Sequence, residues 1–215
     1  MTNFLEQEIG DELFRAVAFA SPDTYLALYT VMPGEAGGGT EVTGGAYARQ
    51  LVENDGVTTP FWNTYAAGIY DNNGEIAFPQ ASAGWGLCVG MTLMSAVTAG
   101  NFLIWGPLGS AHQVFVGTNV DNRINAPGHG RSEDDLIIFG NTHNGLPTGV
   151  TEWTVEYFAI NITADDFQIS LTAAPGSPVA ITVDGDGTFW LSQYRTVNIN
   201  ETFRVPTGQL DITML

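Results

Sequence analysis

The stretch VAITVDGDGTFWLSQ, residues 179–193, decides the class of fold. Two short runs rich in valine, isoleucine, threonine and aromatic residues flank Asp184-Gly185-Asp186-Gly187, whose residues tolerate positive φ and favour a tight turn. Such runs, separated by a turn, are typical of neighbouring antiparallel strands. We therefore predict a β-hairpin here, with strands over residues 179–183 and 188–193.

The same alternation of short apolar runs and turns extends over the chain from Tyr25 onward. The 26 glycines and 10 prolines interrupt the chain too often for a helical bundle. This pattern predicts an all-β protein built as an antiparallel sandwich or barrel. The remaining predicted strands cover residues 24–31, 46–53, 75–78, 87–94, 102–105, 136–139, 153–160, 167–171, 197–205 and 210–214.

The first residues are the exception, because their apolar positions recur at helical spacing. Asn3 can act as an N-cap, and Glu6 follows three residues later as in a capping box. The apolar residues at i, i+4 spacing are Leu5, Ile9, Leu13 and Val17. We predict one short amphipathic helix from Asn3 to about Ala18.

Charge excludes two classes of partner. The chain of 215 residues carries 23 acidic residues against six arginines and no lysine, giving a net charge of −17. Nucleic acids are held mainly through cationic contacts to phosphate, and anionic membranes need a similar basic surface. We therefore expect no nucleic-acid partner and no membrane partner.

Targeting and redox signals are also weak. The N-terminus lacks the basic and apolar regions of a signal peptide, and no apolar run approaches the length of a membrane span. Cys88 is the single cysteine, lies in an apolar stretch and is expected to be a small core residue. We expect a soluble protein that is synthesised in a cytoplasm.

The residue types that carry catalysis do not form a pattern. His112, His129 and His143 stand in loop-like sequence, and no nucleophile elbow or phosphate-binding loop is present. Asp184-x-Asp186 resembles the start of a calcium loop, but Arg195 stands where that loop requires a glutamate. We predict no catalytic, cofactor-binding or metal-binding residues and no cofactor; a weak calcium site and a glycan-degrading enzyme are the alternatives.

Residues 117–131 are polar, punctuated by glycine and proline, and long for a connection inside a compact domain. This segment is predicted to be a linker into a second structural unit.

Four motifs occur in a fixed order along the first half of the chain: LALYT at 26–30, PGEAGGGTEVTGGAYARQ at 33–50, IAFP at 76–79 and GWG at 84–86. In this order they resemble a family of phage virion structural proteins usually labelled phage tail fibre proteins. The resemblance implies a β-rich structural protein on the outer surface of a virion.

The closing part of that family pattern is split in this chain. Its first half is similar to GNFLIWGPL at 100–108, and its second half to VNINETFRVPTGQLDIT at 197–213. The intervening residues resemble small β-modules of phage surface proteins. We therefore predict a β-sandwich attachment module formed by residues 1–110 and 196–215, with a small, outward-facing β-domain over 111–195 inserted before the last two strands.

Five residues are candidates for contacts between subunits: Tyr47, Arg49, Trp85, Trp105 and Arg204. On an extended strand Tyr47 and Arg49 share one face, so Arg49 could clamp a carboxylate across strands or across a subunit boundary. A local ion pair of Arg49 with Glu41 or Glu53 is the alternative. The tryptophans are either interface residues or core residues.

These observations favour a non-enzymatic structural protein. Because the chain is compact and has neither long repeats nor heptads, we predict a capsid decoration or cement protein that binds the major capsid protein, as a homotrimer. The alternative is a tail fibre or baseplate component, or a receptor-binding tail protein.

Overall fold

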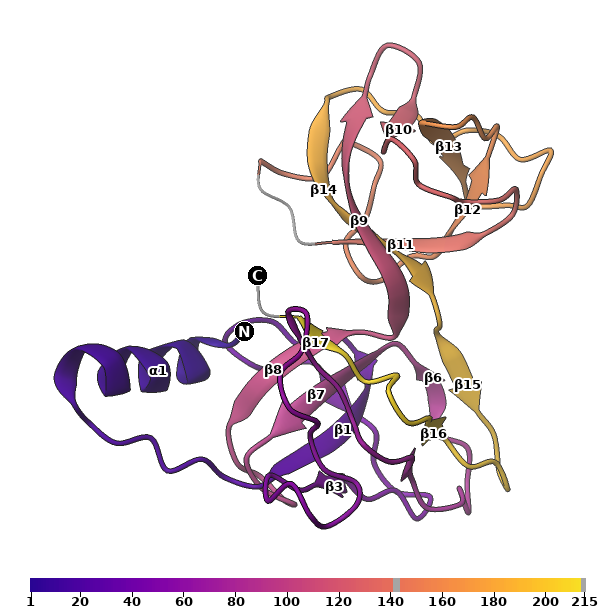
Figure 1. Ribbon diagram of the computed structural model, residues 1–215. Coiled ribbons are helices and arrows are strands. Elements are labelled where there is room, and N and C mark those ends of the chain that lie inside the picture. The colour runs from indigo at the N-terminus through magenta and orange to yellow at the C-terminus, as the bar shows by residue number, and fades with distance from the viewer. Residues whose placement is uncertain (141–143, 214–215) are drawn as a thin grey trace. The chain divides into compact units, whose positions relative to one another are not determined.

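A computed structural model describes residues 1–140 and 144–213 (Figure 1). Over these residues the chain forms one helix, α1 (Asn3–Arg15), and 17 short strands. Every pairing between named strands is antiparallel. The predicted all-β class with one N-terminal helix is confirmed. No described helix is long and apolar enough to cross a membrane.

The chain divides into two compact units. Unit 1 comprises Met1–Pro107 and Arg195–Leu215, and unit 2 comprises Leu108–Tyr194. The inserted domain predicted from sequence, 111–195, starts three residues later than unit 2 and ends one residue later. Each unit is described separately below.

Unit 1 is organised around a five-stranded sheet whose central strand is β1 (Thr24–Val31). β1 pairs on one side with β7 and on the other with β2 and β3, while β8 pairs with the far side of β7. The four middle residues of β1, Leu26 to Tyr29, are all buried. Because successive side chains of a strand point to opposite faces, this part of β1 is covered on both faces. The other strands of this sheet are β2 (Thr40–Glu41), β3 (Gln50–Val52), β7 (Gly90–Met94) and β8 (Phe102–Pro107).

Three short ladders complete unit 1 and tie the C-terminal segment to the N-terminal portion. They pair β15 with β6, β16 with β5, and β17 with β4. Their bounds are β4 (Ile69–Tyr70), β5 (Ile76–Ala77), β6 (Gly86–Cys88), β15 (Arg195–Val197), β16 (Arg204–Val205) and β17 (Ile212–Thr213). Unit 1 therefore consists of one main sheet and three small ladders.

The C-terminal segment differs from the prediction of two closing strands. The predicted strand 197–205 is interrupted by a turn in which the N–H of Glu201 donates to the carbonyl of Asn198, and the Glu201 carboxylate accepts the N–H of Asn198. Asn200 adopts a φ of 67°, which an extended strand does not permit. Three strands therefore follow unit 2.

Unit 2 is a closed six-stranded barrel with the strand order β10-β13-β12-β11-β14-β9 (Figure 1). The strands are β9 (Gly109–Thr118), β10 (Arg123–Asn125), β11 (Leu136–Gly140), β12 (Tyr157–Ile160), β13 (Asp166–Ser170) and β14 (Gly185–Ser192). Its interior is filled by one apolar cluster that includes Phe115, Phe139, Phe167 and Phe189. In small barrels of this size, inward side chains fill the lumen.

The barrel corrects two predictions. Residues 117–131 are not a linker, because they contain the end of β9 and all of β10, paired to each other. The predicted hairpin at 179–193 does not form either, because β14 already begins at Gly185. A Cβ atom at Gly117 would lie 2.2 Å from Pro147, and one at Gly185 would lie 2.4 Å from it. Glycine at these positions therefore lets the chain around Pro147 pack against the barrel wall.

Helix α1 begins and ends close to the predicted bounds. Thr2, not Asn3, is the N-cap, and its hydroxyl accepts the N–H of Leu5. The helix ends at Arg15 because Ala16 adopts a left-handed conformation with a φ of 53°. The predicted end at about Ala18 was therefore too late.

Candidate interaction surfaces

Three residues of the motif at 33–50 meet in one polar network, which we call the Glu41 clamp: Glu41, Tyr47 and Arg49. The Arg49 guanidinium binds both oxygens of Glu41, with Nε and Nη2 each 2.8 Å from a carboxylate oxygen. The Tyr47 hydroxyl donates to Oε1 of the same carboxylate at 3.0 Å. The middle of this motif is therefore joined to its C-terminal part through a single carboxylate.

The clamp also fixes backbone segments that are distant in sequence. Arg49 Nη1 donates to the carbonyls of Ala96 and Ala99, at 2.8 and 2.6 Å, and the Tyr47 hydroxyl accepts the N–H of Leu28 at 2.9 Å. The Arg49 side chain is only 9% exposed. Of the two local ion pairs considered from sequence, the one with Glu41 forms.

Electrostatics keeps Tyr47 and Arg49 of the clamp protonated. Burial raises the pKa of Tyr47 far above its ordinary value, so the hydroxyl remains a donor to Glu41. The hydrogen bond to Glu41 raises the pKa of Arg49, which outweighs the opposing effect of burial. Both groups therefore keep their protons throughout the physiological pH range.

Trp85 belongs to the same region of unit 1. Its indole N–H donates to the carbonyl of Gly45 at 2.9 Å, and its ring meets Tyr47 edge-on with centroids 5.4 Å apart. Tyr47 in turn stacks on Phe78 at 6.0 Å. Of the five interface candidates, Tyr47, Arg49 and Trp85 thus have their polar atoms bonded inside unit 1.

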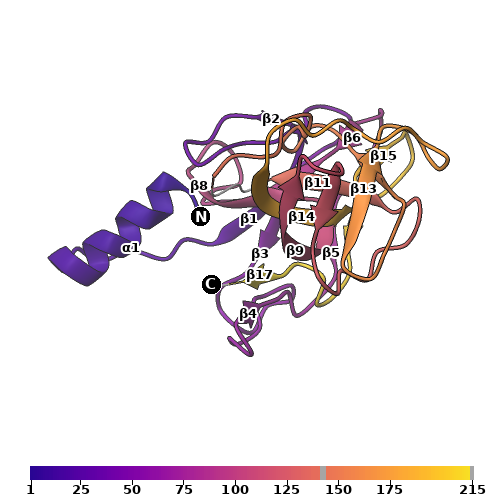
Figure 2. The ribbon, with the colours of Figure 1, turned by 90° about the horizontal axis from the view of Figure 1, so that it is seen from above.

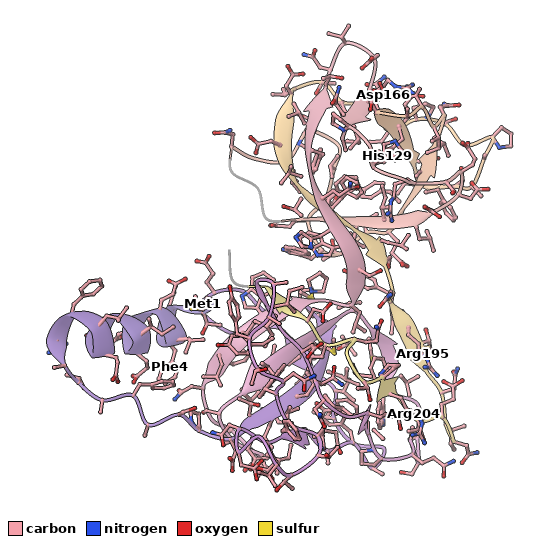
Figure 3. All side chains as sticks on the ribbon, viewed as in Figure 1. Met1, Phe4, His129, Asp166, Arg195 and Arg204 are labelled. Atoms are coloured by element: carbon pink, nitrogen blue, oxygen red, sulfur yellow. The ribbon has the colours of Figure 1, made fainter. Side chains whose placement is uncertain are left out.

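The other two candidates are placed differently. Trp105 is half-buried on β8, opposite Thr92 of β7. Arg204 lies on β16 with a side chain 53% exposed and forms an ion pair with Glu75 (Figure 3). Arg195, also labelled in Figure 3, lies over the ring of Phe203. The five candidates differ in exposure, since Trp85 is buried and the Arg49 side chain is 9% exposed, whereas Arg204 is at the surface.

The residues considered for chemistry are also dispersed. His129 is buried in the barrel (Figure 3), where Nε2 lies 3.1 Å from the carbonyl of Thr163 and Nδ1 accepts the N–H of Arg131. His112 is exposed on β9, and His143 lies outside the described residues. Among residues 1–140 and 144–213, no group of three histidine, cysteine or acidic side chains is placed to hold a metal ion.

The remaining candidates serve structural roles. Asp184 accepts the N–H of Asn119 at 2.7 Å, and Asp186 accepts two hydrogen bonds from Asn144, so these carboxylates tie loops to the barrel. Cys88 is fully buried, and burial raises the pKa of its thiol to about 11. Its thiol therefore stays protonated and unreactive at neutral pH. That the chain is not an enzyme stays a prediction.

Sequence reasoning missed one exposed apolar surface, on what we call the N-terminal arm, residues 3–19. Both views of the ribbon show α1 standing clear of the strands of unit 1 (Figures 1 and 2). None of its residues is buried; Leu13 is 70% exposed and Phe14 is 86% exposed. The i, i+4 pattern indicated an apolar face, but the sequence did not show that this face would be uncovered.

The base of the arm, in contrast, is firmly attached. Thr2 is 1% exposed and donates from its backbone N–H and its hydroxyl to the carbonyl of Leu103 on β8. The N–H of Asn3 donates to the carbonyl of Glu35. The helix therefore starts at a fixed point of unit 1.

The chain folds back on the helix after Arg15. The N–H of Val17 donates to the carbonyl of Asp11, and that of Phe19 donates to the Glu12 carboxylate. A hollow of about 250 Å³ remains on this side of the helix. It is lined by Ile9, Glu12, Leu13 and Phe19.

The chain matches a known protein family. The family model described as Gp80, podophage GP4 fiber I protein gp80, matches residues 1–126, more than half of the 215 residues. The matched region contains the arm, strands β1 to β8 of unit 1, and β9 and β10 of the barrel. The comparison with curated proteins finds no match.

Proposed function

Since this chain belongs to the podophage GP4 fiber I protein gp80 family and is thus a bacteriophage structural protein, we propose that it is a fibre subunit on the outside of the phage particle. One observation carries the proposal, namely that the family match covers the arm and most of unit 1. The region shared with fibre proteins is therefore the one that contains both the Glu41 clamp and the uncovered helix.

In this proposal unit 1 attaches the protein to the particle and the barrel is its outward module. The chain enters the barrel through β9 and leaves it through β14. These two strands are adjacent and antiparallel, and Gly109 at the start of β9 pairs with Ser192 at the end of β14. A module whose ends lie side by side is accommodated in a strand connection with little disturbance to the host unit. Each strand of the barrel is paired on both sides, so the barrel exposes no open sheet edge to another chain.

A capsid decoration protein is the second candidate. It is favoured by the lack of any shaft-like element in the described residues, where the one helix is only 13 residues long. Its partner would be the major capsid protein, which it would bind as a homotrimer to stabilise the shell. Neither candidate requires a nucleic acid, a membrane or a cofactor.

Counting copies distinguishes the two candidates. Quantitative mass spectrometry of purified particles gives the ratio of this protein to the major capsid protein, and gold labelling through a C-terminal tag locates it. A fibre subunit is expected at roughly a few copies per hundred capsid proteins, and a decoration protein at roughly one or one half per capsid protein. Absence from purified particles would contradict both candidates.

The proposal also treats the protein as non-catalytic. Purified protein incubated with surface polysaccharide of the host is expected to release no new sugar ends. Measurable turnover of that polysaccharide would show that a depolymerase activity had been overlooked.

A further inference from the structure

One side of α1 combines an apolar stripe with acidic borders. Leu5, Ile9 and Leu13 recur every four residues and so lie along this side of the helix, where Leu5 and Ile9 are half-buried and Leu13 is exposed. At about 100° per residue, Glu6 and Glu12 fall on either side of that stripe. Leu13 is 70% exposed, and the hollow beside it is open to an apolar side chain from another molecule.

The charge of the helix indicates the chemistry of its partner. Its 13 residues contain four carboxylates and one guanidinium, Arg15, which gives a net charge of −3 (one minus four). Arg15 is bound to Asp11 at 3.1 Å. A complementary partner must therefore present cationic side chains around an apolar centre.

A second copy of this chain does not meet that requirement. The chain has no lysine and a net charge of −17, and four of its six arginines are already in ion pairs. Two arms placed together would bring like charges into contact. A helix of 13 residues is also too short to form a coiled coil without other support.

We propose that the N-terminal arm docks into an apolar groove bordered by lysine or arginine side chains on a different protein of the phage particle. This inference rests on the proposed function, because it takes the particle as the source of the partner. The bonds from Thr2 and Asn3 hold the start of the helix on unit 1, so docking of the arm fixes unit 1 on its partner. The exposed Leu13 enters the apolar part of the groove.

Crosslinking of intact particles tests the identity of the partner. A carbodiimide joins carboxylates to amines without a spacer, and this chain carries no amine except its N-terminus because it has no lysine. The expected product joins a carboxylate of α1 to a lysine of another virion protein. Products that join α1 only to the N-terminal amine of a second copy would overturn the proposal in favour of self-association.

Rebinding measures the contribution of the apolar stripe. Full-length protein is mixed with particles assembled without it, and the copies that sediment with the particles are counted. Leu13→Gln is expected to lower the bound copies about tenfold, as loss of an apolar anchor does at other interfaces. The matched control, Val120→Gln, replaces a side chain 90% exposed on the barrel and should leave binding unchanged.

Ionic strength tests the charged border in the same assay. Raising NaCl from about 0.05 M to about 0.5 M should reduce binding of the wild-type protein severalfold, because the partner charges are screened. Circular dichroism confirms that each variant is folded. Equal binding by Leu13→Gln and the wild type, or binding insensitive to salt, would overturn the docking proposal.

The outcomes separate this inference from the proposed function. If wild-type protein neither occurs in native particles nor rebinds to particles that lack it, the proposed function fails. If wild-type protein occurs in particles but Leu13→Gln rebinds equally well, the proposed function stands and only the docking proposal fails. Sedimentation of the free protein that shows an oligomer abolished by Leu13→Gln would assign the helix face to a second copy.

Discussion

The two units of this protein manage their strand edges in opposite ways. The barrel pairs each of its six strands on both sides, so its backbone hydrogen bonds close into a ring. Unit 1 has an open sheet and three ladders, two of which are only two residues long on each strand. Short ladders contribute few backbone bonds, so side chains must hold unit 1 together.

The side chains that hold each unit together also differ in kind. The interior of the barrel is one cluster of apolar residues in which Phe139 contacts Phe115, Tyr157 and Phe189. Unit 1 also buries apolar residues, among them Leu26, Phe78 and Trp85, but in addition it places charged and amide groups, including Arg49, at points where its segments meet. The comparison teaches that the barrel depends chiefly on one apolar cluster, whereas unit 1 adds polar connections to its apolar packing, and each of the predictions below tests one side of it.

The largest effect is expected in the barrel core. Phe139 is fully buried, and Phe139→Ala should lower the free energy of unfolding of the barrel by about 4 kcal/mol, through lost burial and the cavity that remains. Hydrogen exchange in increasing denaturant, followed separately in peptides of each unit, measures this. Equal loss of protection in unit 1 would show that the two units unfold as one and would break the comparison.

The Glu41 clamp should give the next largest effect. Arg49→Met removes the cationic partner of the Glu41 carboxylate, which keeps only its hydrogen bond from Tyr47, and also removes the Arg49 donor from two carbonyls. This change should destabilise unit 1 by about 3 kcal/mol. The matched control is Arg204→Met, which removes an exposed ion pair with Glu75 and should cost less than about 1 kcal/mol. Chemical denaturation of both variants checks the difference. Similar losses for the two would mean that burial of the clamp contributes nothing.

Much of the fold is readable from local sequence. The alternation of short apolar runs with turns predicted an all-β chain, and the i, i+4 spacing of apolar residues predicted the single helix, although its N-cap is Thr2 and not Asn3. These signals suffice because they depend on residues close together in the chain.

Long-range packing explains what sequence reasoning missed. Gly117 and Gly185 were interpreted as linker and turn residues, although both lie in barrel strands and are glycine because Pro147 packs against them. No local pattern shows which distant segment approaches a glycine. For the same reason, Arg49 could have paired with Glu41 or Glu53 until the sheet placed Glu41 beside it.

The candidate surfaces show the same limit. Tyr47, Arg49 and Trp85 were identified by their motifs, but a motif does not distinguish residues that build a unit from residues that bind another molecule. Leu13 shows the opposite case. An apolar helical face predicts that Leu13 is buried, but the structure leaves its side chain exposed. Whether a side chain is exposed depends on the whole fold, so it could not be predicted from the local sequence around Tyr47, Arg49 and Trp85 or around Leu13.

A third prediction concerns the connection of the C-terminal segment to unit 1. Asn72 is fully buried, with Nδ2 donating to the carbonyl of Pro206 and Oδ1 accepting the N–H groups of Gln209 and Leu210. Asn72→Ala leaves these groups unsatisfied and should destabilise unit 1 by about 2 kcal/mol. Hydrogen exchange of residues 206–212 measures the loss. Asn73→Ala, at a partly exposed neighbour, is the control. An equal loss there would mean that the buried hydrogen bonds of Asn72 add nothing specific to the stability of unit 1.

The smallest effect tests whether a polar connection also matters in the barrel. Burial acts to raise the pKa of Asp166, but hydrogen bonds from Thr163 and from Arg123, at 2.5 Å, outweigh it and lower that pKa. Because the folded-state pKa lies below the unfolded one, the stabilisation is present above the unfolded value, about 3.9, and is lost as the pH falls through the folded value. Arg123→Gln should therefore destabilise the barrel at pH 7, by at most about 1 kcal/mol.

The pH dependence of that difference is the decisive measurement. Urea unfolding of the wild type and Arg123→Gln, followed in barrel peptides from neutral pH down to about 2.5, should show the two curves converging as Asp166 becomes protonated in both proteins. A difference that stays constant over this range would mean that Arg123 acts through its packing and not through its charge. A difference well above that of an exposed ion pair would instead place a polar connection among the main supports of the barrel, and the contrast between the two units would then be one of degree.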